Sequence, residues 1–442
     1  MSGKRGPART RSLPARLPFY YGWVIVVLGG MSVMASGPGQ TYGVAVFIDP
    51  MIEDLGWSRT LVSTLYTVGS LCSAAAIFAI GWSLDRWGAR TVVVSATVGL
   101  SLTAVWMSRV ASPVGLFAGF AGLRVFGQGA LNMSGSTVVA VWFVRRRGLV
   151  VALAVGIGWM VSMAFLPPLS HWFIDLYGWR GAWVAIALLV SGVMLVPAAL
   201  LLRRTPESVG LLPDGARPQA LEPGAPEPQG AVAEVHWTLR EALRTRAFWF
   251  ISFAASAYSF IGTALMFHQV SLLGERGISS GVAASIFTVM AAASFVGNFG
   301  AGYLNDRLPN RYQLVLSQLA IAAVLLLLLF GMTATWHAFM YGVLLGLSSG
   351  ISLNTGSVIY ANYYGRRHLG SIRGVSGIGA MAMSAIGPMP LGAIFDAAGS
   401  YAPGLWLFLG FVPFTVAAAL LSTPPRRSGT ATPGAESVPM VA

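Results

Sequence analysis

The sequence predicts an all-α membrane protein whose twelve transmembrane helices form two pseudo-symmetric bundles of six. Three observations lead to this prediction. Hydrophobic residues make up 55% of the 442 positions and charged residues only 10%, twelve apolar stretches are long enough to cross a bilayer, and the second half of the chain repeats the first. So few charges cannot build a water-facing surface, so lipid must cover most of the protein.

The twelve stretches follow from length, because a bilayer core of about 30 Å needs roughly 20 apolar residues in a helix. All 15 carboxylates of the chain lie outside them, and the single cysteine, Cys72, excludes an intramolecular disulfide. We expect helices at 20–48, 60–84, 91–108, 113–141, 149–172, 181–202, 248–273, 279–304, 312–332, 336–360, 374–394 and 402–422.

The polar segments divide the chain into domains. Residues 203–246 are rich in Pro, Gly and Glu and are predicted to form a flexible cytoplasmic linker. It separates an N-terminal bundle at 20–202 from a C-terminal bundle at 247–422. The segments 1–19 and 423–442 are expected to be a cytoplasmic N-terminal segment and a cytoplasmic tail.

The orientation follows from the basic residues. With the N-terminus inside, 23 of the 28 Lys and Arg residues fall in cytoplasmic segments and four fall outside, at Arg59, Arg109, Arg180 and Arg276. We therefore expect a multi-pass protein of the cytoplasmic (inner) membrane. The net charge of +13 is then topogenic and faces anionic headgroups, which argues against nucleic acid as a partner.

A shift of 221 residues superposes the two halves without a gap. The shift pairs Gly81, Asp85 and Arg86 with Gly302, Asp306 and Arg307, and Gly135-Ser136 with Gly356-Ser357. It also pairs Arg145-Arg146 with Arg366-Arg367, and Pro167, Asp175 and Gly178 with Pro388, Asp396 and Gly399. Two six-helix repeats run parallel about an axis along the membrane normal, an arrangement suited to alternating access.

Several segments resemble a known family. Residues 81–90, GWSLDRWGAR, are similar to the loop signature G-x-x-x-D-[RK]-x-G-[RK]-[RK] of the major facilitator superfamily, and 302–307 repeat part of it. The phrases at 21–23, 56–59, 142–148 and 365–370 resemble the bacterial monocarboxylate and oxalate/formate branch. The resemblance covers about residues 20–422 and implies a transporter of small solutes.

The chain departs from this branch at two places. The branch commonly holds the substrate carboxylate with an arginine in helix eight, where this sequence has Asn298, and some members add a lysine in helix eleven, where 374–394 carries no charge. The resemblance therefore does not supply the charged groups that would bind a monocarboxylate.

Arg124 is the one fixed charge inside a predicted span. At about 1.5 Å per residue it lies roughly 16 Å into helix four, near the bilayer midplane. A charge at that depth normally faces a cavity or a partner. Gln128 and Asn132 follow on the same helical face. We expect an anion anchor or part of the coupling path, with a structural arginine as the alternative.

Other candidates are weaker. His268, towards the outer end of helix seven, is the second coupling candidate, because histidine exchanges protons near neutral pH; the alternative is a histidine hydrogen-bonded between helices. The run from Gly37 to Tyr42 weakens helix one near its middle and either exposes groups for substrate or forms a plain kink. Besides Arg124, Gln128, Asn132 and His268, the substrate-binding candidates are Gln40, Tyr42, Tyr66, Trp159 and Asn298.

The loop signature and its repeat predict a cytoplasmic gate. Asp85, Arg86, Asp306 and Arg307 lie just past helices two and eight. A carboxylate there can cap a neighbouring helix or pair with arginine and so hold the inner side shut.

The motifs favour a secondary transporter over an enzyme. The chain has no HExxH, no CxxC and no nucleophile elbow, and we expect neither a cofactor nor a bound metal. Our interpretation is a monomer that moves a small organic anion by proton symport or anion exchange. Efflux of a hydrophobic compound, and a receptor that retained the transporter fold, remain the alternatives.

Overall fold

The structure, a computed structural model, describes residues 18–143, 147–215, 237–305, 307–365 and 368–425, and every regular element among them is helical. The first half contains α1 (Gly22–Ala35), η2 (Gly37–Gly39), α2 (Thr41–Ala45), α3 (Ile48–Leu55), α4 (Arg59–Met107), α5 (Pro113–Gly122), η3 (Leu123–Leu131), α6 (Asn132–Trp142), α7 (Arg147–Val190), η4 (Ser191–Leu195) and α8 (Val196–Leu201).

Short helical turns, η5 (Glu207–Val209) and η6 (Pro213–Gly215), follow α8. The second half contains α9 (Leu239–Leu243), α10 (Arg246–Phe267), α11 (Gln269–Gly274), α12 (Ser280–Asn305), α13 (Asn310–Leu326), η8 (Leu327–Gly331), α14 (Thr335–Tyr364), α15 (Leu369–Ile386), α16 (Pro388–Ala398) and α17 (Ala402–Leu421).

Two long helical runs each contain two membrane crossings. The 49 residues of α4 would span about 74 Å at 1.5 Å per residue, more than twice a bilayer core. The run is broken at Gly88, where φ is 79°. The run α7 is broken in the same way at Gly178, where φ is 68°. The connections expected at 85–90 and 173–180 are therefore largely helical, with one break in each. Glycine occupies both breaks because it takes positive φ values without a Cβ clash.

The described part of the chain contains 11 helical segments long and apolar enough to cross a membrane. One of them, Leu149–Leu201, has 53 residues and includes the break at Gly178, so it is long enough for two crossings. The architecture is therefore consistent with twelve crossings in a multi-pass all-α membrane protein. Large apolar side chains such as Val114, Phe165 and Phe330 stay exposed on the outside of the bundles, where lipid would cover them.

The internal repeat is visible in the backbone. Gly56 and Gly277 both have positive φ, 66° and 77°, and they are 221 residues apart. Gly178 and Gly399, the same distance apart, both have φ 68°. These turns therefore have equivalent conformations in the two repeats. Each uses glycine because a positive φ favours that residue.

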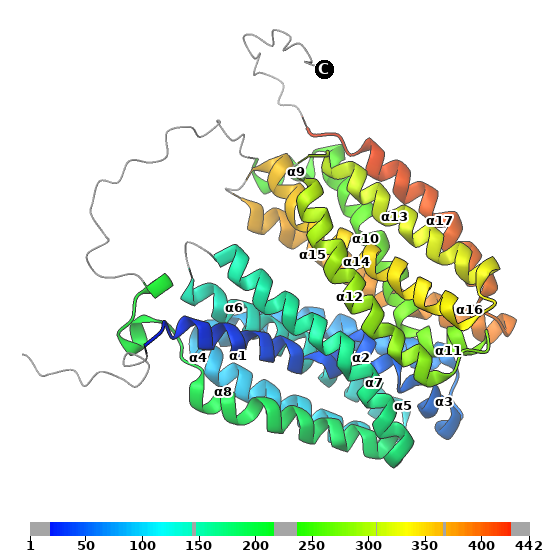
Figure 1. The fold of residues 1–442 in the computed structure, drawn as a ribbon, viewed down its shortest axis with the longest axis horizontal. Coiled ribbons are helices and arrows are strands. Elements are labelled where there is room, and N and C mark those ends of the chain that lie inside the picture. The colour runs from blue at the N-terminus through cyan, green and yellow to red at the C-terminus, as the bar shows by residue number, and fades with distance from the viewer. Residues whose placement is uncertain (1–17, 144–146, 216–236, 306, 366–367, 426–442) are drawn as a thin grey trace, which may run out of the picture.

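The two bundles meet at one end of the molecule. Figure 1 shows them converging where α3, α11 and α16 lie and spreading apart towards the end that carries α6 and α9. A shared hydrophobic core forms at the converging end, where Tyr42, Ala45, Met163 and Leu166 of the first bundle pack among residues of the second, such as Phe287. The charge distribution predicts that this converging end faces outward.

Candidate functional site

Two irregular backbone segments touch in the middle of the first bundle. Helix one is interrupted: α1 ends at Ala35, η2 is a short 3-10 turn, and Gln40 is extended with φ −90° and ψ 159°. Helix four is wound as a π-helix over η3. A Cβ on Gly39 would lie 2.1 Å from the carbonyl oxygen of Leu123 and 2.8 Å from Cα of Gly127. Glycine is therefore required for the two backbones to approach this closely.

Arg124 lies in this π-helical segment and is 2% exposed. Its Nη1 donates a hydrogen bond of 3.2 Å to the carbonyl oxygen of Gly39. Its guanidinium carbon lies 5.1 Å from the centroid of the Tyr66 ring, and Nε is buried without a partner. Within the described residues no carboxylate lies within 4.0 Å of it. The helix break thus supplies a carbonyl to Arg124, and the described part of the chain supplies no counter-ion for its positive charge.

Tyr66 connects this site to the second bundle. Its hydroxyl is 2.8 Å from the hydroxyl of Thr41, directly after the break in helix one. Its ring centroid is 4.6 Å from that of Phe267 at the end of α10. A movement of the second bundle at Phe267 would therefore reach Arg124 through a single aromatic ring.

The other candidates of the first bundle lie around the break. Gln40 donates to Ser36 Oγ at 3.2 Å, and Tyr42 packs edge-on against Trp159, with ring centroids 6.1 Å apart. Gln128 is in the π-helical segment with Arg124, and its Oε1 is buried without a partner. Asn132 is half-buried at the start of α6. The break and the π-helical segment therefore carry most of the polar candidates of this bundle.

His268 is enclosed within the second bundle and is 1% exposed. Its Nε2 is 2.9 Å from the carbonyl oxygen of Pro388, to which it donates, and its Nδ1 is 3.2 Å from the Tyr401 hydroxyl. Both ring nitrogens therefore have partners in the same bundle, the arrangement expected of a histidine that connects helices. Phe267, whose ring is 5.0 Å from that of His268, lies between it and Tyr66.

Asn298 lies apart from this group. Its Oδ1 accepts a hydrogen bond of 3.0 Å from Asn354, so it joins α12 to α14. These helices pack closely here, because a Cβ on Gly350 would meet the backbone nitrogen of Asn298 at 2.6 Å. No described contact joins Asn298 to Arg124 or His268.

The bundles are joined by equivalent hydrogen bonds at the converging end. Thr67 Oγ1 donates to the carbonyl oxygen of Ala385 at 2.7 Å. Thr288 donates in the same way to the carbonyl oxygen of Ala164. In both bonds the donor and the acceptor correspond under the 221-residue shift. The repeat therefore extends from the sequence to the contact between the bundles.

A carboxylate strengthens this contact on one side of the pseudo-twofold axis. The two oxygens of Asp396 accept hydrogen bonds from the backbone nitrogens of Arg59, at 3.2 Å, and Thr60, at 2.6 Å. These are the first amides of α4, so a side chain of the second bundle caps a helix of the first. The Arg59 guanidinium lies over the Phe395 ring at 4.9 Å and pairs with Asp49.

The equivalent contact on the other side uses a histidine. Asp175, the counterpart of Asp396, is 2.9 Å from Nδ1 of His171. Nε2 of His171 is 2.8 Å from the hydroxyl of Ser280, where α12 begins. We define Asp396, Arg59, Thr60, Asp175, His171 and Ser280 as the outer latch. Sequence reasoning missed it as a contact, although the pairing of Asp175 with Asp396 under the repeat shift was the available signal.

The predicted gate at the other end is described only in part. Arg86 lies over the Trp82 ring at 5.4 Å, and Arg307 lies over the Tyr303 ring at 4.1 Å. The side chain of Asp85, the whole of Asp306 and the pair Arg366-Arg367 lie outside the described residues. The gating role of these four residues, Asp85, Arg86, Asp306 and Arg307, remains a prediction.

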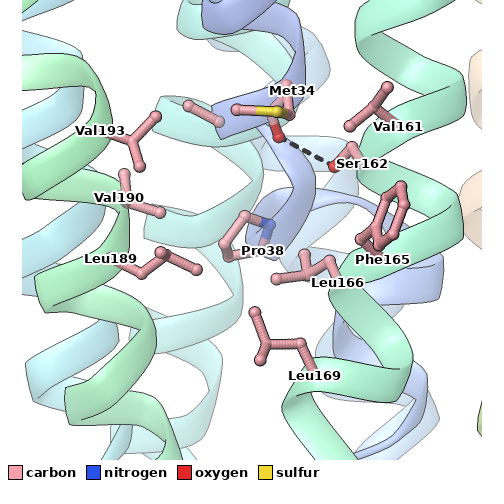
Figure 2. Close-up of a pocket in the computed structure, with 11 residues that line it drawn as sticks. Met34, Pro38, Val161, Ser162, Phe165, Leu166, Leu169, Leu189, Val190 and Val193 are labelled. Atoms are coloured by element: carbon pink, nitrogen blue, oxygen red, sulfur yellow. Dashed lines mark hydrogen bonds between the residues drawn. The ribbon is translucent and has the colours of Figure 1, made fainter.

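An apolar pocket of about 190 Å³ lies beside the break in helix one, on its side towards α7 and η4. Figure 2 shows Met34 and Pro38 on one wall, Phe165 and Leu166 on a second, and Val190 and Val193 on a third. Ser162 Oγ donates to the carbonyl oxygen of Met34 at 2.8 Å and supplies the polar contact drawn in the pocket. This pocket can hold an apolar group but offers no charge.

Comparison with known proteins gives a consistent result. The family model described as Major Facilitator Superfamily matches residues 22–388 and 250–441. The oxalate:formate antiporter of Oxalobacter formigenes is 25% identical over 79% of this chain and 80% of its own length. Monocarboxylate transporter 11 of Mus musculus is 26% identical over 89% and 85%. A multidrug resistance protein B homolog of Mycobacterium tuberculosis is 30% identical over only 35% and 28%.

Solved structures show the same fold. A bacterial homolog of the human lysosomal transporter Spinster, solved in an inward-facing and occupied conformation, superposes with a TM-score of 0.68. The superposition covers 91% of this chain and 96% of that protein, at 15% sequence identity.

Proposed function

This chain belongs to the Major Facilitator Superfamily, and we propose that it exchanges small organic anions across the cytoplasmic membrane by alternating access, with Arg124 as the substrate anchor. The observation that carries the proposal is a buried guanidinium with one carbonyl partner and no carboxylate near it in the described chain. A buried charge is costly unless it is paired, and an anionic substrate would supply the missing partner.

A carboxylate is the group that best fits this site. Arginine has five N–H donors in a planar fork, and the Gly39 carbonyl takes one of them. Two parallel hydrogen bonds to a carboxylate would use donors that have no partner among the described residues. Two of the similar proteins carry the names oxalate:formate antiporter and monocarboxylate transporter, which agrees with a small carboxylate as substrate.

Exchange is the simpler form of coupling. Arginine does not lose its proton in proteins, so Arg124 cannot itself carry the driving proton. His268 is hydrogen-bonded at both ring nitrogens within one bundle. In exchange, the anion neutralises Arg124 while the bundles reorient, and an empty carrier would have to reorient with an unpaired buried charge. Proton symport through His268 is the alternative form of coupling.

The outer latch gives this cycle a closed side. We propose that the outer latch, together with the Thr67–Ala385 and Thr288–Ala164 bonds, holds the outer side shut while substrate exchanges with the cytoplasm. Opening outward would then break these contacts, and the predicted gate around Asp85 would close the inner side.

A counterflow assay tests the proposal. Proteoliposomes loaded with an unlabelled carboxylate should take up labelled carboxylate, from a panel that includes oxalate, formate and lactate. Uptake should fall to background when the internal anion is omitted, and it should not require a pH gradient. Uptake into empty vesicles that is driven by a pH gradient would contradict exchange and support proton symport.

Efflux of a hydrophobic compound is a second candidate function, and the apolar pocket of Figure 2 favours it. Its lining carries no charged residue, and two of its lining residues, Phe165 and Leu189, are exposed on the surface, where lipid would reach them. A hydrophobic cationic dye in the same vesicles separates the two functions. Dye transport that Arg124→Gln leaves unchanged would support efflux and contradict the anion anchor.

A further inference from the structure

A basic pocket lies at the end of the second bundle that is predicted to face the cytoplasm, remote from the outer latch. It has a volume of about 690 Å³ and is lined by Thr245, Arg246, Ala247, Arg311 and residues 423–425. Helices α10 and α13 begin beside it, at Arg246 and Asn310. The pocket therefore combines two guanidinium groups with the positive ends of two long helices.

The two guanidinium groups have no counter-ion in the described chain. Neither Arg246 nor Arg311 forms an ion pair there at up to 4.0 Å. Arg311 contacts Tyr312, through a hydrogen bond of 3.2 Å to its hydroxyl and through its ring at 5.0 Å. Its Nε is buried and has no hydrogen-bond partner among the described residues. A buried donor of a charged group is costly when it lacks a partner, and an anion in the pocket would supply that partner.

Two aromatic side chains place the pocket at the level of the lipid headgroups. Trp249 is 58% exposed and Tyr312 is 45% exposed, on the first turns of α10 and α13. Both helices are apolar enough to span a bilayer from these ends. Exposed Trp and Tyr at the ends of spans mark the membrane interface, where their amphipathic rings are stable.

We propose that this pocket binds the phosphate-bearing headgroup of an anionic phospholipid in the cytoplasmic leaflet. The headgroup phosphate would lie between Arg246 and Arg311, and its acyl chains would leave the pocket along the apolar faces of α10 and α13. Basic pockets between transmembrane helices on the cytoplasmic side bind such headgroups. The site is independent of the transported substrate, because it lies at the end of one bundle and shares no residue with the Arg124 site.

Binding can be measured on the detergent-purified full chain with short-chain phosphatidylglycerol as the probe. We expect phosphatidylglycerol to raise the melting temperature and to bind with saturation. Phosphatidylcholine of the same chain length, which carries a phosphate but no net charge, should bind much more weakly. In Arg246→Gln/Arg311→Gln the affinity for phosphatidylglycerol should fall about 30-fold, since each basic residue near a headgroup contributes about a factor of five.

A matched control is available on the same surface. Arg240→Gln/Arg244→Gln removes the same charge from exposed positions of α9 and its C-terminal end that do not line the pocket, and it should bind as the wild type does. Equal losses in both double variants, or equal binding of the two lipids, would overturn the proposal. Inorganic phosphate that binds as tightly as phosphatidylglycerol would also overturn the lipid assignment. Should the double variant fail to fold, Arg246→Lys/Arg311→Lys provides the test: it must retain most of the binding.

Discussion

At the scale of single residues, Arg124 carries most of the functional argument. A charged side chain near the bilayer centre costs about 2.5–3.5 kcal/mol on insertion scales. The hydrogen bond to Gly39 and the face of Tyr66 offset much or all of that cost, since a hydrogen bond to a charged group contributes about 1.5–3 kcal/mol and a cation–π contact about 0.5–2 kcal/mol. These partners hold Arg124 in place without neutralising its charge, and for this reason we propose an anion as its further partner.

The first prediction concerns this charge. Arg124→Gln should weaken binding of a transported carboxylate at least about 100-fold, because two charge-assisted hydrogen bonds are lost. Arg124→Lys should weaken it about tenfold, because an ammonium group cannot make two parallel bonds. Binding to purified protein by isothermal titration is the measurement, and Arg109→Gln, at an exposed position, is the control. Unchanged affinity in Arg124→Gln would contradict the role of Arg124 as the substrate anchor. If the melting temperature of this variant also falls, Arg124 is a structural residue.

At the scale of elements, the break in helix one and the π-helical winding of helix four depend on each other. The extended backbone at Gln40 leaves the Gly39 carbonyl to accept from Arg124, and η3 presents Arg124 and Gly127 to that same turn. π-helical segments are frequent at functional sites because they alter the direction of side chains within a helix. The pair of irregular segments therefore forms one unit that positions the cation.

The second prediction tests that unit. Gly39→Ala should lower stability by about 1–3 kcal/mol or more, because its Cβ would collide with the backbone of η3 at 2.1 Å and no flexible side chain can move aside. Thermal unfolding in detergent is the measurement, with carboxylate binding measured in parallel. Gly156→Ala is the control, since a Cβ there meets nothing within 4 Å. Equal melting temperatures for the two variants would show that the close contact is not needed.

The third prediction concerns the outer latch. Asp396→Ala removes both acceptors from the first amides of α4, and loss of such a cap costs about 0.5–2 kcal/mol. The outer side should then open more often, by a factor of about 2 to 30 in the ratio of open to closed molecules. Asp396→Asn should restore part of the closed population.

Spin labels at positions 109 and 279, in a Cys72→Ala background, report the separation of the bundles at this end. Both positions are exposed, one on each bundle. Glu53→Ala, which removes an exposed carboxylate at the same end, should leave the distance distribution unchanged. A distribution that is identical in wild type and Asp396→Ala would show that the cap does not hold the outer side closed.

At the scale of the whole molecule, the described residues of the two bundles share a hydrophobic core at the converging end. Tyr42, Met163 and Leu166 belong to the first bundle and lie in that core. Under the orientation predicted from the charges, the molecule is closed on the outside. Which side is closed therefore depends on the topology, and the topology is directly measurable.

The fourth prediction is that topology. Arg90 and Arg109 lie at exposed positions near opposite ends of helix three, whose span runs from Arg86 to Met107. In intact cells, and in the same Cys72→Ala background, a membrane-impermeant maleimide should label Arg109→Cys and spare Arg90→Cys, because 23 of the 28 basic residues are then cytoplasmic. Both variants should react after the membrane is permeabilised. Labelling of Arg90→Cys alone would show that the protein has the opposite orientation in the membrane, with the outer latch facing the cytoplasm.

The sequence by itself determined the features that depend on local composition. Apolar length predicted the crossings, the 221-residue shift predicted two equivalent bundles, the loop signature led to the family, and the Gly-Pro-Gly run predicted the interruption of helix one. It also singled out Arg124, because a fixed charge in an apolar span is conspicuous at a single position. The crossings, the interruption and Arg124 need only the neighbouring residues, since the bilayer sets the length and the polarity that each span must have. The repeat needs only a comparison of the chain with itself.

The tertiary structure decided which groups meet. The partner of Arg124 is 85 residues away at Gly39, the two partners of His268 are 120 and 133 residues away, and Asp396 caps a helix that begins 337 residues earlier. The helical pattern did not reveal the π-helical winding of η3 either. Each of these contacts depends on how the helices pack against one another, and the apolar pattern of a single span leaves that packing open.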